Sequence, residues 1–222
     1  MLGNRGDQIM RAMNVMVVAS LNRGKQEEFR ELLAKHNLKL GTLDQYVRNA
    51  SFLETVESEA KSATYYDNAF AKCLAAFRAA KVPTFADDSG IELDALNGEP
   101  GVQAAHFGKA KPNETQDQAN RRAILDALKG KANRKARMRC VLVFMVEGLA
   151  LKAEGVCEGT ISEKETGSAG FGYDSIFLPD GANGRSFAEL NQEEKNRFSH
   201  RSLAVNNLVQ LMHEREVQLV RP

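Results

Sequence analysis

A run of apolar residues near the start of the chain, VMVVA at 15–19, constrains the fold more than any other feature. Its side chains are largely β-branched and none is polar, which is typical of a strand buried on both faces of a sheet. After the loop SLNRGK at 20–25, apolar residues recur at helical spacing at Phe29, Leu32 and Leu33. We expect Glu27 and Glu28 in the first turn of that helix, where the helix dipole favours acidic side chains. A strand, a short loop and a helix in this order begin an α/β unit.

The remaining predicted elements complete an α/β pattern with a mixed sheet. Helices are predicted at residues 64–80, at 113–130 and from near Ser199 onward. Two long antiparallel strands are predicted within 139–162, joined near Glu147, and a short strand follows the glycine-rich loop GSAGFGYD. Between these elements we expect a short strand at 51–56 and a turn-rich connection at 91–101.

Composition and charge narrow the classes of function. The chain has 222 residues, enough for one large or two-lobed domain, and its net charge of +1 gives no basic field for a nucleic-acid polymer. No apolar run approaches the ~20 residues of a membrane span, so we expect a cytoplasmic protein that binds no membrane. Residues 1–13 lack the apolar stretch of a signal peptide and are predicted to be a disordered extension. The three cysteines lack a metal-ligand spacing, and we expect them to be reduced and mostly buried.

Two neighbouring aspartates, Asp87 and Asp88, follow the apolar run VPTFA at 82–86. One of them can be explained as a side chain that caps the turn after a strand. The second is better explained by a hard cation such as Mg²⁺, which prefers carboxylate oxygens and also removes the repulsion between the two neighbours. The stretch therefore predicts a divalent-cation site at the end of a strand.

Three further features suit an anionic ligand, although each also has an ordinary structural explanation. The loop at 20–25 offers helix amide groups and Lys25 to an anion, but it lacks the first glycine and the hydroxyl residue of a P-loop and can equally be a plain strand–helix turn. Lys72 shares a helix face with Asn68, four residues earlier, or is a solvated surface lysine. A cationic group around the Ser199 cap suits a hydrogen-bonding anion or simply decorates a polar helix entrance. Its members are Lys195, His200 and Arg201.

Five blocks of sequence occur in one order between about Val15 and Leu211: VVASLNRGKQEEFRELL, TYYDNAFAKC, PTFADDSGIELDALNGEPGV, GFGYDSIF and FAELNQEEKNRFSHRSLA. Together they resemble the Ham1 family, the inosine triphosphate pyrophosphatases. The resemblance implies that residues 14–222 form one elongated, two-lobed α/β domain, with a central mixed β-sheet flanked by helices and a nucleotide cleft between the lobes. It also implies a homodimer, Mg²⁺ as cofactor, and cleavage of non-canonical purine nucleoside triphosphates between the α- and β-phosphates.

The resemblance implies roles for individual residues as well. Asp88 is expected to be the catalytic base and a metal ligand, and Lys72 to assist at the phosphates. Glu59 is the expected second metal ligand, with Glu57 as the rival and Glu54 as the third choice. The expected substrate-binding residues are Ser20, Asn22, Arg23, Gly24, Lys25, Ser89, Phe171, Gly172, Tyr173, Asp174, Lys195, His200 and Arg201.

Three positions depart from the family pattern. Leu21 stands where the family commonly has glycine, which predicts a less tightly bent loop. Ser175 replaces the usual proline after FGYD, which predicts a looser loop end. His106 stands where an arginine is typical, which questions a phosphate or structural contact at that position.

Hydrogen-bond polarity predicts which bases such an enzyme accepts. Hypoxanthine and xanthine carry a 6-keto acceptor that Arg201, His200 or a backbone N–H can meet, whereas adenine presents a donor there. We therefore expect ITP, dITP and XTP to be hydrolysed to the nucleoside monophosphate and pyrophosphate far ahead of ATP. Phe171 or Tyr173 can stack on the ring, or equally be a buried aromatic that supports the loop.

Two alternative functions stay open. A Maf-like pyrophosphatase would act on modified pyrimidine or methylated nucleotides, and the blocks GFGYD and SHR argue against it. A non-catalytic nucleotide sensor would need ligand-binding residues but no metal-bound base, and the pair Asp87 and Asp88 with Lys72 argues against that function. A panel of nucleoside triphosphates with identified products separates the three.

Overall fold

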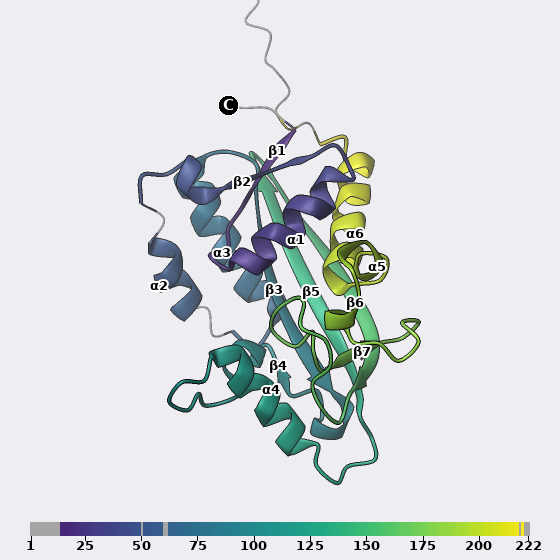
Figure 1. Cartoon of the computed structure of the whole chain (residues 1–222). Coiled ribbons are helices and arrows are strands. Elements are labelled where there is room, and N and C mark those ends of the chain that lie inside the picture. The colour runs from purple at the N-terminus through teal and green to yellow at the C-terminus, as the bar shows by residue number, and fades with distance from the viewer. Residues whose placement is uncertain (1–13, 50, 60–61, 218, 220–222) are drawn as a thin grey trace, which may run out of the picture.

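The computed structural model describes residues 14–49, 51–59, 62–217 and 219, and Figure 1 shows how they are arranged. Seven strands of this part form one sheet in the order β2-β1-β3-β5-β6-β7, with β4 paired to β3. The strands are β1 (Val15–Val18), β2 (Lys39–Thr42), β3 (Thr84–Leu93), β4 (Pro100–Gly101), β5 (Lys135–Val146), β6 (Leu149–Ile161) and β7 (Phe177–Pro179). The helices are α1 (Arg23–Ala34), α2 (Phe52–Glu59), α3 (Tyr65–Ala80), α4 (Gln116–Ala127), α5 (Gln192–Lys195) and α6 (His200–Glu214). Short 3₁₀ turns are η1 (Leu43–Gln45), η2 (Asp94–Leu96), η3 (Ala104–His106) and η4 (Phe187–Glu189).

The sheet is mixed, and the predicted α/β fold class is confirmed. β1 pairs with β2 and with β3 in parallel, whereas β3, β5, β6 and β7 pair with one another in antiparallel order. Helices cover both faces of the sheet (Figure 1). The two long antiparallel strands expected within 139–162 correspond to β5 and β6, which turn at Glu147 and Gly148. All three cysteines are buried and free, as expected.

The two crossovers that flank β1 lie on opposite faces of the sheet. α1 follows β1 and packs with α6 on one face, where the ring centroids of Phe29 and Phe85 lie 5.1 Å apart. α3 precedes β3 and packs on the other face, against Ala86 and Val17. Because β2 and β3 flank β1, the two crossovers diverge at the carboxyl end of β1. Ligands of open α/β sheets bind at such topological switch points.

β3 is longer than β1 and runs past its carboxyl end. β1 pairs with β3 at Thr84 and Phe85, and β4 joins the same edge farther along, at Ile91 and Glu92. Between these pairings, Asp87–Gly90 pairs with β5 on its other edge, and no described strand covers it on the β1 side. The aspartate pair therefore lies inside a ten-residue strand with one open edge. The expectation that it ends a strand is wrong.

Two other expectations about local structure are wrong. The stretch 51–56 contributes to α2 and forms no strand, because Phe52, Leu53 and Val56 fall at helical spacing and the fully buried Leu53 packs in the core beneath α3. A short apolar run of this kind cannot be assigned from its periodicity alone. The expected connection at 91–101 begins with the last residues of β3, where buried and half-buried side chains still alternate as in a strand.

The far end of the sheet has its own core beneath α4, at the bottom of Figure 1. Ile124 and Leu128 pack there with Ile91, Met138 and Phe177. The chain thus has two ends with separate cores, joined by the long strands β3, β5 and β6. In the described ranges no helix is both long and apolar enough to span a bilayer. The extension predicted at 1–13 lies outside the described residues, and the single-domain organisation stays a prediction.

Candidate active site

The N-terminus of α1 opens at the carboxyl end of β1. Asn22 caps this helix, because its side-chain oxygen accepts a hydrogen bond from the backbone N–H of Lys25 at 3.0 Å. The helix therefore begins at Arg23, and the expectation that Glu27 and Glu28 lie in its first turn is wrong. The free amide groups of the first turn and the positive end of the helix dipole make this position suitable for a phosphate.

The side chain of Asp87 points to the face of the sheet that carries α1. Its Oδ2 atom accepts hydrogen bonds from Lys25 Nζ and from Ser89 Oγ, each at 2.7 Å, and the residue is 1% exposed. Burial alone would raise the pKa of this carboxyl, but the charges of Lys25, Lys72 and Arg201 outweigh it and hold the pKa far below its usual range. Asp87 is therefore ionised near neutral pH and holds Lys25 in an ion pair.

Asp88 points to the opposite face, toward α3. Asn68 Nδ2 donates to its Oδ2 atom at 3.0 Å, and Lys72 Nζ lies 3.5 Å from its Oδ1 atom. Lys72 also donates to the carbonyl oxygen of Asp87 at 2.6 Å, so the expected shared face of Asn68 and Lys72 is confirmed. Burial raises the pKa of Asp88, and the nearby Lys72 and Lys25 oppose that rise only in part. A carboxylate held in this way is suited to accept a proton.

The donors that could hold a metal ion centre on Asp88. Within the described residues no group of three or more His, Cys, Asp or Glu side chains is arranged to hold a metal. The side chains of Glu59 and Glu57, the expected second ligand and its rival, lie outside the described part, while Glu54 is exposed on the first turn of α2. A carboxylate such as Asp88, one further glutamate and substrate phosphates make a donor set of the kind that Mg²⁺ uses. Of the described residues, Asp88 is the one whose carboxylate suits the expected metal, and the second protein ligand stays a prediction.

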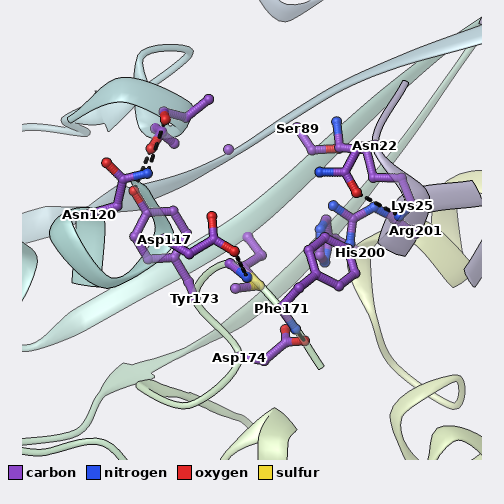
Figure 2. A pocket seen from close by; sticks show the side chains of 15 residues that line it. Asn22, Lys25, Ser89, Asp117, Asn120, Phe171, Tyr173, Asp174, His200 and Arg201 are labelled. Carbon is purple, nitrogen blue, oxygen red and sulfur yellow. Dashed lines mark hydrogen bonds between the residues drawn. The ribbon is translucent and has the colours of Figure 1, made fainter. Parts of the chain in front are cut away.

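A pocket lies beside this strand edge, on the face of the sheet that carries α1 and α6 (Figure 2). Most of the expected substrate-binding residues line it, namely Asn22, Lys25, Ser89, Phe171, Gly172, Tyr173, Asp174, His200 and Arg201. Asp117 and Asn120 of α4 line it too, and the sequence analysis missed both. The pocket therefore lies between the two ends of the molecule.

The other four expected binding residues, Ser20, Arg23, Gly24 and Lys195, do not line this pocket. Ser20 is buried, and its Oγ atom accepts a hydrogen bond from Asn22 N at 3.3 Å. A Cβ atom on Gly24 would come within 2.7 Å of the Phe171 ring, so this ring packs directly on the first turn of α1. Lys195 is buried with its Nζ atom 5.5 Å from the centroid of the Phe171 ring, and Arg23 is exposed.

The two aromatic residues of the glycine-rich loop take different places. Tyr173 donates from its hydroxyl to the carbonyl oxygen of Ala104 in η3 at 2.5 Å. It also packs against the core beneath α4, so it supports the loop. The Phe171 ring lies within reach of two cations, with Arg201 at 5.1 Å and Lys195 at 5.5 Å from its centroid. Of the two rings, Phe171 is the one that lines the pocket beside these cations, and stacking on a ligand stays a prediction.

A buried ionic cluster underlies this part of the pocket. Glu28, in the second turn of α1, pairs with Arg201 at 2.7 Å and with Lys195, and Lys195 also pairs with Asp174 at 2.8 Å. Burial would raise the pKa of Glu28, but Arg201 and Lys195 outweigh it and hold the pKa below its usual value. The sequence analysis missed Glu28, although its position four residues before Leu32 places it on the buried face of the helix.

His200 is the one member of the cationic group that the structure keeps neutral. It is 3% exposed, and its Nδ1 atom has no hydrogen-bond partner among the described residues. Burial, together with the neighbouring charges of Arg201 and Lys195, lowers its pKa well below the ordinary value of 6.5. A neutral imidazole offers one donor and one acceptor to a ligand.

The lowered pKa of His200 predicts a loss of stability in mild acid. As the pH falls through 6.5, the unfolded chain binds a proton at His200 and the folded chain does not. The stabilisation that comes from the neutral His200 is therefore present above that pH and is lost as the pH falls below it. Between pH 7.5 and 5.5, the free energy of unfolding should fall by about 1 kcal/mol more in the wild type than in His200→Gln. Urea denaturation at the two pH values measures this. His213→Gln, at an exposed position, is the control and should keep the pH dependence of the wild type. An equal pH dependence of the free energy of unfolding in His200→Gln and His213→Gln would contradict the prediction.

The three departures from the family pattern also have a place in the structure. Leu21 is exposed beside the cap of α1, and His106 is exposed at the end of η3. Ser175 donates from its hydroxyl to Glu165 at 2.8 Å, and its carbonyl oxygen accepts from Thr166 N at 2.8 Å. The loop end at Ser175 is thus tied by hydrogen bonds where a looser end was expected.

Comparison with known proteins adds independent information. The sequence pattern that describes the Ham1 family matches residues 16–211. A dITP/XTP pyrophosphatase of Leptothrix cholodnii is 40% identical over 89% of this chain and 96% of its own length, and one of Nitrosomonas europaea is 38% identical over 95% of this chain and 100% of its own length. The structure of a HAM1 protein from Coxiella burnetii is similar with a TM-score of 0.74 at 32% identity, and covers 90% of this chain and 98% of its own.

Proposed function

The chain belongs to the Ham1 family, and from this premise we propose that it hydrolyses ITP, dITP and XTP to the nucleoside monophosphate and pyrophosphate. One observation carries the proposal. Asp88, held by Asn68 and Lys72, lies on the open edge of β3, its neighbour Asp87 pairs with Lys25 in the first turn of α1, and the Phe171 pocket begins on the other face of the sheet at that edge. A triphosphate at the edge can thus reach the acidic group while its base occupies the pocket.

The chemistry follows from where the charges lie. Lys25 and the first turn of α1 bind the phosphates, and Lys72 offsets the charge that moves onto the departing pyrophosphate. Asp88 orients the attacking water and takes its proton, since its carboxylate has a raised pKa and is already fixed by Asn68. When bound at Asp88 and a glutamate of α2, Mg²⁺ would supply further charge neutralisation at the phosphates. Cleavage falls between the α- and β-phosphates because pyrophosphate is the leaving group.

Recognition of the base rests on the cationic side of the pocket. Arg201 and the neutral His200 can each donate a hydrogen bond to a 6-keto oxygen, and the Phe171 ring beside them offers a stacking surface. Adenine carries an amino group at this position, which is itself a donor and cannot accept a hydrogen bond from Arg201 or His200. An unpaired buried polar group of this kind costs about 1–3 kcal/mol.

A panel of triphosphates tests the function. We expect kcat/KM for ITP and XTP to exceed that for ATP by about 10–100-fold, which corresponds to the unpaired donor in the adenine complex. The assay measures pyrophosphate release with Mg²⁺ present and identifies the nucleotide product. Comparable values for ATP and ITP would contradict the proposal, preference for modified pyrimidines would favour the Maf-like alternative, and binding without hydrolysis would favour a sensor.

Three accompanying properties are part of the same proposal. Mg²⁺ is the proposed cofactor, because carboxylate and phosphate oxygens are its preferred donors. We further propose a homodimer and a cytoplasmic location, where a pool of free nucleotides is available as substrate. Sedimentation of the purified protein tests the homodimer, and the distribution of the protein in fractionated cells tests the cytoplasmic location.

A further inference from the structure

Both backbone polar groups of Gly172 are held by one helix at the far end of the molecule. Asp117, in the first turn of α4, accepts a hydrogen bond from Gly172 N at 2.9 Å, drawn as a dashed line in Figure 2. Arg121, one turn later, donates from Nη1 to Gly172 O at 2.9 Å. Two charged side chains of α4 therefore hold a single loop residue by hydrogen bonds.

The residue that α4 holds is the one that follows Phe171. Gly172 adopts a positive φ of 60°, a backbone conformation that glycine adopts without strain, so the direction of the loop changes at this point. On its other side, the backbone N–H of Phe171 donates to Asp174 at 2.9 Å. The Phe171 ring is thereby fixed in front of Gly24 and Arg201 through its own backbone and that of its neighbour.

A second layer of contacts fixes the direction of Arg121. Its Nε atom pairs with Glu165 at 2.8 Å, and Ser175 donates to the same Glu165 oxygen at 2.8 Å. Ser175 stands where the family commonly has proline. In this chain a hydrogen bond therefore holds the end of the glycine-rich loop, whose backbone a proline ring would otherwise restrain. α4 itself is anchored at its start by a capping box between Thr115 and Gln118.

We propose that Asp117 and Arg121 are positioning residues, which act through Gly172 to hold the Phe171 ring at the place where the purine of the substrate stacks. The inference rests on the proposed function for its kinetic consequence but not for its structural one. Asp88 lies on the opposite face of the sheet from this pocket. A misplaced Phe171 ring therefore weakens binding of the base in ground state and transition state alike, which raises KM and leaves kcat unchanged.

The kinetic test replaces each positioning side chain. Asp117→Ala and Arg121→Met should each raise KM for ITP by about tenfold, the effect of losing one hydrogen bond to a charged group, with kcat within about twofold of wild type. Asp117→Asn should stay near wild type in KM, because its side-chain oxygen still accepts from Gly172 N. Arg122→Met is the matched control, since Arg122 lies next to Arg121 on α4 but pairs with Glu114, just before that helix. Equal KM values in Asp117→Ala and the control would overturn the proposal.

A fluorescence test does not depend on activity. The chain contains no tryptophan, so Phe171→Trp places a single reporter at the ring itself. Adding Asp117→Ala to this variant should raise quenching by acrylamide and lower the anisotropy, whereas adding Arg122→Met should change neither. If the reporter is unaffected by Asp117→Ala, the positioning role is wrong whatever the substrate is. If the reporter responds but the wild-type protein hydrolyses no triphosphate, the proposed function fails and the positioning role stands.

Discussion

Asp88→Asn is expected to lower kcat for ITP hydrolysis by about 10²–10⁴-fold at saturating Mg²⁺, the range for removal of a positioned acid–base group. The amide keeps the size of the carboxylate but can neither take a proton from water nor carry the negative charge that Lys72 faces at 3.5 Å. Steady-state kinetics with ITP at several Mg²⁺ concentrations measures the effect. Saturation with the metal separates lost catalysis from weakened metal binding.

The interpretation of that result depends on two comparisons. Asp126→Asn, on the exposed face of α4, should retain wild-type kinetics and shows that removal of an aspartate charge alone has no effect. The melting temperature of Asp88→Asn should stay close to that of wild type, because this carboxyl is partly exposed and its ionised form is disfavoured by burial. Near-full activity of Asp88→Asn would remove Asp88 from the role of base and leave the mechanism without one.

The elements that the sequence predicted correctly are those with long, regular patterns. α3 combines a capping residue with a long apolar stripe, and β5 and β6 are long runs of strand-forming residues joined by a glycine turn. Such signals are local and need no tertiary partner. The short stretch at 51–56 carries too few residues to separate a helix from a strand, and only the packing of Leu53 decides it.

The candidate site was predictable where a motif marks it and unpredictable where distant segments meet. Asp88, Lys72 and Asn68 are brought together as their helix and strand positions suggest. By contrast, Asp117 gains its partner only through contact with Gly172, 55 positions away, and Glu28 through Arg201, 173 positions away. Pairs at such separations depend on how the layers pack, and a single sequence does not contain that information.

Glu28→Ala is expected to lower the free energy of unfolding by about 3–5 kcal/mol, the cost of breaking a buried ion pair from one side. Glu28 is the shared partner of Lys195 and Arg201, and all three side chains are at most 7% exposed. Without it, Lys195 keeps its ion pair with Asp174, whereas Arg201 loses its ion-pair partner and keeps only the more distant charges of Asp87 and Asp174 among the described residues. For a chain of this length, such a loss corresponds to a melting temperature lower by about 10 °C.

Glu27→Ala provides the matched control, because Glu27 is the adjacent residue of the same helix and is exposed. It should shift the melting temperature by no more than about 1–2 °C, as expected for a surface substitution. Thermal denaturation and urea denaturation of the two variants make the comparison. If Glu28→Ala were as stable as Glu27→Ala, Lys195 and Arg201 would have to be neutralised in another way, by solvent or by rearrangement toward Asp174. The pocket wall built on these cations would then owe its position to packing around Phe171 and not to charge.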